Sequence, residues 1–190
     1  MNDRVVIAMF FLGRRNFLRG ATAIGAIAGL GAIKPLWAQT LDNRKIPDVI
    51  KKPIPSSGEM IPAVGLGSWI TFNVGNDPVL RDQCANVMQA FFDGGGRMID
   101  SSPMYGSSQE VIGYGLDKLG ARDRVFSTDK VWTSDDGAEQ IAQTSEHWNI
   151  EKFDLLQVHN LVGINDNLPL LFDMKDAGRL RYVGVTTSHG

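Results

Sequence analysis

Residues 95–106 read Gly-Gly-Arg-Met-Ile-Asp-Ser-Ser-Pro-Met-Tyr-Gly. The glycines predict the end of a helix, Met98–Asp100 a short apolar strand, and the following residues a polar loop that carries Tyr105. Asp100 therefore stands at the end of a strand. A buried charge in such a place is costly unless it is paired, so this stretch indicates a site as well as a structural element.

Apolar strands alternate with amphipathic helices on both sides of this stretch. Asp77-Pro78 predicts a helix start, because an aspartate cap precedes a first-turn proline. Ser107 with Glu110 three residues later predicts a capping box for the next helix. The remaining predicted elements are a hairpin at 54–61, strands at 63–67, 98–100, 125–130, 153–159 and 182–186, and helices at 138–148 and 168–177.

The spacing of the strands predicts how they are arranged. Strands alternating with helices indicate βαβ units and a parallel sheet. Four strands end at Asp100, Lys130, His159 and Thr186. These ends are 30, 29 and 27 residues apart, a near-constant step that favours a barrel over a doubly wound sheet. We expect an α/β fold of the (β/α)8 TIM-barrel type with an N-terminal β-hairpin, in which catalytic residues gather at the C-terminal strand ends.

Polar side chains stand at just those strand ends. If the strands are neighbours, Asp100 can pair with Lys130, and Tyr105 can lie over the same mouth. A nearby ammonium favours the phenolate, so we expect Lys130 to lower the pKa of Tyr105 and make it a proton donor near neutral pH. His159, neutral in apolar surroundings, can orient a substrate carbonyl through a hydrogen bond.

Each of these residues also has a purely structural interpretation. His159 can be a hydrogen-bonded core residue, Lys130 can reach solvent, and residues 100–103 can form a turn with an Asx cap. All of these interpretations would have to coincide at successive strand ends. The joint pattern therefore favours a catalytic site.

The motifs around these residues resemble those of the aldo/keto reductase family over about residues 54–187. Residues 95–106 resemble the family segment that carries the catalytic aspartate and tyrosine. Residues 127–130 resemble its lysine strand, and residues 154–159 its histidine strand. All four catalytic residue types occur in order and at family-like spacing.

This resemblance implies a reductase in which the cofactor NADP(H) delivers a hydride to a small-molecule carbonyl substrate. It implies that Tyr105 protonates the carbonyl oxygen and that His159 positions the substrate. Lys130, paired with Asp100, would tune Tyr105.

The resemblance also indicates cofactor-binding residues. They are Gly67, Ser68, Trp69, Asp100, Thr186 and Thr187. Residues 67–69 resemble the loop that approaches the nicotinamide ribose. Thr186-Thr187 stands where the family commonly has a Ser-Asn pair that holds the carboxamide. A threonine hydroxyl can replace serine, whereas Thr187 lacks the paired donor and acceptor of an amide.

The first residues of the chain resemble an export signal. Arg14-Arg15 is followed by an apolar stretch at 21–33, too short to span a bilayer, and by small residues at 36–38. The arginine pair resembles the twin-arginine pattern, which implies export by the twin-arginine machinery to the periplasm, with no stable membrane span after cleavage. An uncleaved membrane anchor is the alternative. The expected segments are a signal peptide at 1–38, a linker at 39–53 and a partial barrel at 54–190.

Composition excludes several kinds of partner. Residues 1–38 hold five of the 19 basic residues and one of the 21 acids, so residues 39–190 hold 14 and 20, a net charge of −6. With no basic run, nucleic acid is not an expected partner. Cys84 is the single cysteine and is expected in the core, and the three histidines lack ligand spacing, so no metal site is expected.

Length raises a question about activity. A closed barrel needs roughly 250 residues, whereas residues 39–190 number 190 minus 38, which is 152. We expect a sheet truncated after about five strands, marginal stability and weak or no NADPH binding. The leading hypothesis is a carbonyl reductase that truncation can inactivate. One alternative is a non-catalytic half-barrel remnant or binding module. Another is an aldolase that forms a Schiff base on Lys130, but the paired spacing of Asp100 and Tyr105 disfavours it.

Overall fold

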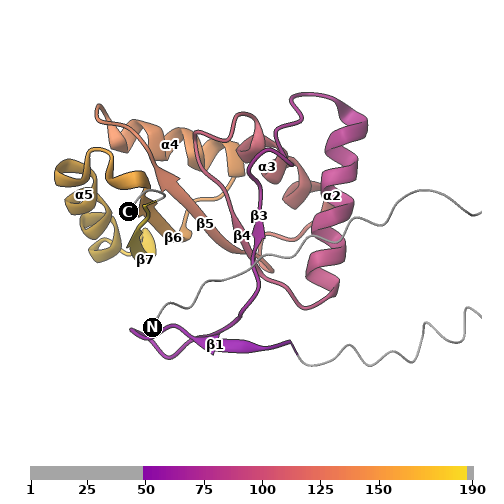
Figure 1. Cartoon of the computed structure of the whole chain (residues 1–190), viewed down its shortest axis with the longest axis horizontal. Coiled ribbons are helices and arrows are strands. Elements are labelled where there is room, and N and C mark those ends of the chain that lie inside the picture. The colour runs from indigo at the N-terminus through magenta and orange to yellow at the C-terminus, as the bar shows by residue number, and fades with distance from the viewer. Residues whose placement is uncertain (1–48, 188–190) are drawn as a thin grey trace, which may run out of the picture. The chain divides into compact units, whose positions relative to one another are not determined.

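The computed structural model describes residues 49–187. The predicted signal peptide at 1–38 and most of the predicted linker lie outside the described residues. Strands and helices alternate along the chain (Figure 1). In order, the elements are β1 (Lys51–Pro53), β2 (Met60–Pro62), β3 (Leu66–Gly67), α2 (Pro78–Asp93), β4 (Met98–Asp100), α3 (Ser108–Leu119), β5 (Phe126–Val131), α4 (Gly137–Trp148), β6 (Phe153–Val158), the 3-10 turn η1 (His159–Leu161), α5 (Ile164–Asp176) and β7 (Leu180–Val185).

Five strands form one parallel sheet in the order β3-β4-β5-β6-β7, so each strand pairs with the next one along the chain. A helix connects each pair, and Figure 1 shows α2 to α5 wrapping the outer side of the curved sheet. Sequential parallel pairing with a helix in every crossover is the barrel arrangement. The predicted α/β class with parallel strands is confirmed, and the described residues form a partial barrel.

The hydrophobic core lies between the helices and the sheet. Trp148 of α4 and Leu156 of β6 are fully buried there, and Trp148 meets Phe153 edge-on with ring centroids 5.5 Å apart. Cys84 of α2 is buried in the same core, as predicted. Within residues 49–187, no helix combines the length and the apolar character that crossing a membrane requires.

The helices α3 and α4 approach each other backbone to backbone. A Cβ atom on Gly113 would lie 2.0 Å from the backbone oxygen of His147, far inside van der Waals contact. Glycine at this position therefore sets how closely the two helices pack, and with it the position of the α3 residues that face the sheet.

The two predicted helix caps have different outcomes. Asp77 caps α2 as predicted, because its Oδ1 accepts from two backbone N–H groups of the first turn at 2.9 and 3.0 Å. The capping box predicted for α3 was wrong, although the helix begins at the expected place. The Ser107 hydroxyl instead accepts from the N–H of Gly75 at 2.8 Å and donates to Asn73 Oδ1 at 3.1 Å. Ser107 thereby ties the loop after β3 to the start of α3.

Two predicted boundaries were also wrong. β1 pairs antiparallel with β2, with Lys51 level with Pro62, so the hairpin begins inside the predicted linker at 39–53. The short lysine- and proline-containing strand has the composition of a linker, and only its partner strand reveals it. Helix α5 begins at Ile164, before the predicted start at 168. The earlier start was missed because the N-cap is Gly163, which has no capping side chain that a sequence pattern could show.

The turn of the hairpin is fixed to β7 near the N-terminal ends of the strands. Glu59 accepts hydrogen bonds from Arg181 and, at 2.8 Å, from the Tyr182 hydroxyl, which also bonds Ser57 at 2.8 Å. Arg181 pairs with Asp154 of β6 as well. We call these five residues the clasp. It secures the end of the sheet opposite to the one that carries the ionisable residues described next.

Candidate active site

The C-terminal ends of neighbouring strands bring the predicted residues to one edge of the sheet. Asp100 is the last residue of β4, and Lys130 is the last but one of β5. His159 follows β6 directly, and Thr186 follows β7. Gly67 of β3 is level with Asp100 in the strand register. The prediction that these residues share one mouth is confirmed.

Lys130 and Asp100 form an ion pair at this mouth. The Lys130 Nζ lies 2.7 and 2.6 Å from the two carboxylate oxygens of Asp100 and 2.6 Å from the backbone oxygen of Ser101. The Lys130 side chain is only 5% exposed, while that of Asp100 is 33% exposed. An ammonium has three N–H donors, and all three have acceptors here. The predicted pairing is confirmed, and the pair satisfies a charge that would otherwise be costly to bury.

Tyr105 lies in the loop between β4 and α3, beside the ion pair. Its ring centroid is 5.3 Å from Lys130 Nζ and 6.2 Å from the His159 ring. Burial and, after it, the negative charges of Asp100 and Asp129 raise the pKa of Tyr105 above its usual value. The prediction that Lys130 lowers this pKa was wrong. The ammonium of Lys130 donates to Asp100 and to the backbone oxygen of Ser101. The carboxylate charge of Asp100 therefore offsets the effect of the ammonium charge on the phenol.

His159 is held by hydrogen bonds on both ring nitrogens. Its Nδ1 lies 2.7 Å from Thr186 Oγ1, which also accepts from the N–H of Asn160 at 3.1 Å. A thioether sulfur can only accept, so Nε2, 2.9 Å from Met104 Sδ, carries the imidazole hydrogen, and Nδ1 accepts from the Thr186 hydroxyl. Burial and then the charge of Lys130 lower the pKa of His159, whereas Asp100 raises it less. The predicted neutral imidazole is therefore favoured.

The predicted cofactor-binding residues differ in their surroundings. Gly67 borders open space, since no atom lies within 4 Å of where its Cβ would be, and Trp69 is 63% exposed. Both can border a bound nicotinamide ribose. Ser68 is wholly buried, and its hydroxyl donates to Ser101 Oγ at 3.0 Å, so its side chain faces the protein instead. Thr186 faces His159, and Thr187 lies beside it at the exposed end of β7.

Sequence reasoning missed Asp129, the residue before Lys130. Asp129 is completely buried on the helix side of β5, where it accepts from the Trp148 indole at 2.7 Å and the Gln109 amide at 3.0 Å. An acid within an apolar strand was the available signal. Its partners come from α3 and α4, which the sequence does not place next to it.

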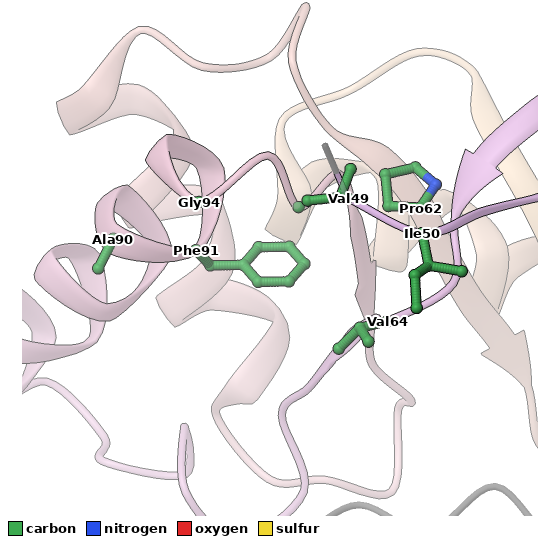
Figure 2. Close-up of a pocket in the computed structure, with 8 residues that line it drawn as sticks. Val49, Ile50, Pro62, Val64, Ala90, Phe91 and Gly94 are labelled. Carbon is green, nitrogen blue, oxygen red and sulfur yellow. The ribbon is translucent and has the colours of Figure 1, made fainter. Parts of the chain in front are cut away.

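An apolar cavity of about 380 Å³ lies elsewhere, at the N-terminal end of β4. Figure 2 shows the Phe91 ring of α2 pointing across it toward Val49. Its lining residues are Val49, Ile50, Pro62, Val64, Ala90, Phe91, Gly94 and Gly96. It contains no ionisable side chain and lies at the other end of β4 from Asp100, so it is separate from the candidate site. In the same described region, no cluster of His, Cys, Asp and Glu side chains could hold a metal ion.

Comparison with known proteins adds independent information. The aldo/keto reductase family matches residues 63–189. An aldo-keto reductase of Bacillus subtilis, YhdN, is 27% identical over an alignment of 143 residues, and the match covers 65% of this chain and 42% of that protein. An aldo-keto reductase of Mycolicibacterium smegmatis is 27% identical over an alignment of 140 residues, and the match covers 69% of this chain and 48% of that protein. The chain thus spans less than half the length of these curated relatives.

Solved structures share the fold. An aldo-keto reductase from Klebsiella pneumoniae in complex with NADPH superposes with a TM-score of 0.61 at 23% identity, covering 72% of this chain and 50% of that one. An aldo/keto reductase from Brucella melitensis gives a TM-score of 0.61 at 23% identity, covering 74% and 55%. At this identity the likeness concerns the fold, a parallel α/β barrel.

Proposed function

Since this chain belongs to the aldo/keto reductase family, we propose that it is an NADP(H)-linked oxidoreductase that reduces aldehyde or ketone carbonyls. The observation that carries the proposal is the Lys130–Asp100 ion pair, with the Tyr105 ring 5.3 Å from the ammonium and His159 alongside. A proton donor, a charged pair and a neutral hydrogen-bond donor converge at one strand-end mouth. That combination suits the protonation of a carbonyl oxygen.

Each side chain has a distinct part in this chemistry. Nε2–H of His159 would orient the carbonyl oxygen, because the hydroxyl of Thr186 holds the other nitrogen. Tyr105 would transfer its hydroxyl proton to that oxygen, and the ammonium of Lys130 would partly offset the negative charge of Asp100 and Asp129 beside the phenolate left behind. The raised pKa of Tyr105 keeps the phenol protonated at neutral pH, as a donor must be.

A nicotinamide cofactor would supply the hydride that reduces the carbonyl carbon. The open space at Gly67, the exposed indole of Trp69 and the partly exposed carboxylate of Asp100 fit its approach to the mouth. The preference for NADP(H) is supported by the NADPH complex of the Klebsiella pneumoniae protein. Because the chain spans less than half of its curated relatives, reduction by this chain is a property to be measured.

The experiment is a steady-state assay of NADPH oxidation with a panel of aldehydes and ketones. Tyr105→Phe and Lys130→Met are each expected to lower kcat/KM by about 100-fold or more. Tyr114→Phe is the matched control, because Tyr114 lies on α3 and donates to Asp82 away from the mouth. Loss of activity in the control as large as in Tyr105→Phe, or no activity with any carbonyl despite NADPH binding, would refute the proposal. The second result would favour a non-catalytic binding module.

We also propose that residues 1–38 direct the protein to the periplasm by the twin-arginine route. The support is the sequence pattern of Arg14-Arg15, the short apolar stretch and the small-residue ending. Residues 1–40 fused to a reporter are expected to reach the periplasm, and replacement of both arginines by lysine is expected to abolish transfer. Delivery that persists after this replacement would exclude the twin-arginine route.

A further inference from the structure

Asp129 is a buried carboxyl group directly behind the candidate site, and the reaction proposed above does not use it. Its exposed fraction is zero. We propose that Asp129 is a positioning residue for the proton donor Tyr105: it holds Lys130 from the helix side of β5 and adds a second carboxylate charge behind the ammonium. This inference rests on the proposed reductase function.

Three hydrogen bonds fix the carboxyl group. Its Oδ1 accepts from the backbone N–H of Lys130 at 2.7 Å and from the Gln109 amide at 3.0 Å. Its Oδ2 accepts from the Trp148 indole at 2.7 Å. These donors belong to β5, α3 and α4, so one side chain joins three elements. Because successive strand residues point to opposite faces, the clamp behind the sheet fixes the backbone from which Lys130 projects toward Asp100.

Asp129 also changes the charge around Lys130. Lys130 is flanked by Asp100 at the mouth and by Asp129 behind, so two carboxylates and one ammonium leave a net charge of −1 when all are ionised. That negative charge opposes formation of the phenolate, and Asp129 contributes to raising the pKa of Tyr105. Burial raises the pKa of Asp129 itself to about 7, against the opposing effects of its hydrogen bonds and of Lys130. The charge behind the site therefore changes near neutral pH.

Few other charged groups face Asp129. On β6 the residue level with it is Leu156, which is apolar. On the helix side, Gln109 separates it from His147 of α4, whose Nδ1 lies 3.2 Å from Gln109 Oε1, and His147 Nε2 lies 3.7 Å from a carboxylate oxygen of Glu110. The groups that titrate or carry charge around Asp129 are thus Lys130 and Asp100 in front and the His147–Glu110 pair behind Gln109.

The direct test is a titration of Tyr105 that needs neither substrate nor cofactor. The chain has three tyrosines, so carbon-13 NMR of ring-labelled tyrosine resolves them, and Tyr105→Phe identifies the Tyr105 signal. Asp129→Asn is expected to lower the titration midpoint of Tyr105 by about one pH unit. Asp129→Glu retains the charge and is expected to restore the midpoint. Asp135→Asn, an exposed acid on the loop after β5, is the matched control and should leave it unchanged.

The amide of Asp129→Asn would face the Trp148 indole N–H with a second donor. The double variant Asp129→Asn/Trp148→Phe removes this conflict if the single variant folds poorly. An unchanged Tyr105 midpoint in a folded variant that lacks the charge overturns the inference, even if the protein is an active reductase. Active variants should also show the same downward shift in the alkaline limb of the pH–rate profile. No carbonyl reduction, together with a shifted midpoint, would instead refute the proposed function and leave the effect of Asp129 on Tyr105 in place.

Discussion

The burial of Asp129 predicts how the free energy of unfolding changes with pH. The pKa of this carboxyl group is about 7 in the folded protein against an ordinary value of 3.8. Between these values the folded state binds more protons at Asp129 than the unfolded state does, so the stability that this group contributes is fully present below about pH 4 and is lost as pH rises through about 7. The difference is about 3 pH units at ~1.4 kcal/mol each, so the loss from this group is about 4 kcal/mol.

The perturbation is Asp129→Asn, since an amide does not titrate. Urea unfolding followed by circular dichroism at about pH 4.5 and about pH 8 gives the free energy of unfolding of both proteins. The difference between them should change by about 3 kcal/mol across this range, because at about pH 4.5 the carboxyl group is already mostly ionised in the unfolded chain, with the wild type losing stability relative to the variant as pH rises. His159 contributes the opposite slope, because its pKa is lowered on folding, but it does so in both proteins and cancels in the difference.

Asp135→Asn is again the matched control and should follow the wild type at each pH. Parallel stability curves for wild type and Asp129→Asn would refute the reasoning. They would mean that the three hydrogen bonds fully offset the effect of burial on the pKa of Asp129, so that the carboxyl group titrates in the folded protein as it does in the unfolded chain.

Three further predictions follow from individual contacts. Asp77→Ala removes the acceptor of two backbone N–H groups of α2 and should lower the free energy of unfolding by about 1 kcal/mol in urea titrations, whereas Asp77→Asn should cost less. Gly113→Ala forces a methyl group against the backbone oxygen of His147 and should cost about 2 kcal/mol or more, visible as a lower Tm; an unchanged Tm would contradict the close approach of α3 and α4. Thr186→Val removes the hydroxyl that holds His159 Nδ1 and should lower kcat/KM about tenfold, while nitrogen-15 NMR of the imidazole shows a mixture of tautomers; a single Nε2–H tautomer would disprove this role.

The position of the site could be predicted from sequence because strand ends in a parallel sheet share one edge. Asp100, Lys130 and His159 end successive strands at a near-constant step, so their convergence followed from topology alone. The direction of the Tyr105 pKa shift could not be predicted in this way. It depends on which acceptors bind the three ammonium hydrogens of Lys130, and these acceptors are set by the exact positions of Asp100 and Ser101 in the folded protein.

Contacts between residues far apart in the sequence account for the other errors. Ser107 matched a local capping motif, but Asn73, 34 residues away, binds its hydroxyl instead. Asp129 was visible as an acid in an apolar strand, yet its importance depends on Gln109 and Trp148, which only helix packing brings to it. Local patterns thus predicted the elements, whereas the partners of polar side chains depended on the tertiary structure.

The clasp has a consequence for the order in which the molecule is assembled. Glu59 and Arg181 are 122 residues apart in the chain, so the carboxylate leaves the ribosome long before its partner has been synthesised. Closing so long a loop carries a large entropy cost, which favours forming this contact late, after the intervening strands have paired. Arg181 reaches Glu59 while also holding Asp154, so it can do both only when β7 lies in register beside β6. The contact therefore forms only after β7 has paired in register with β6.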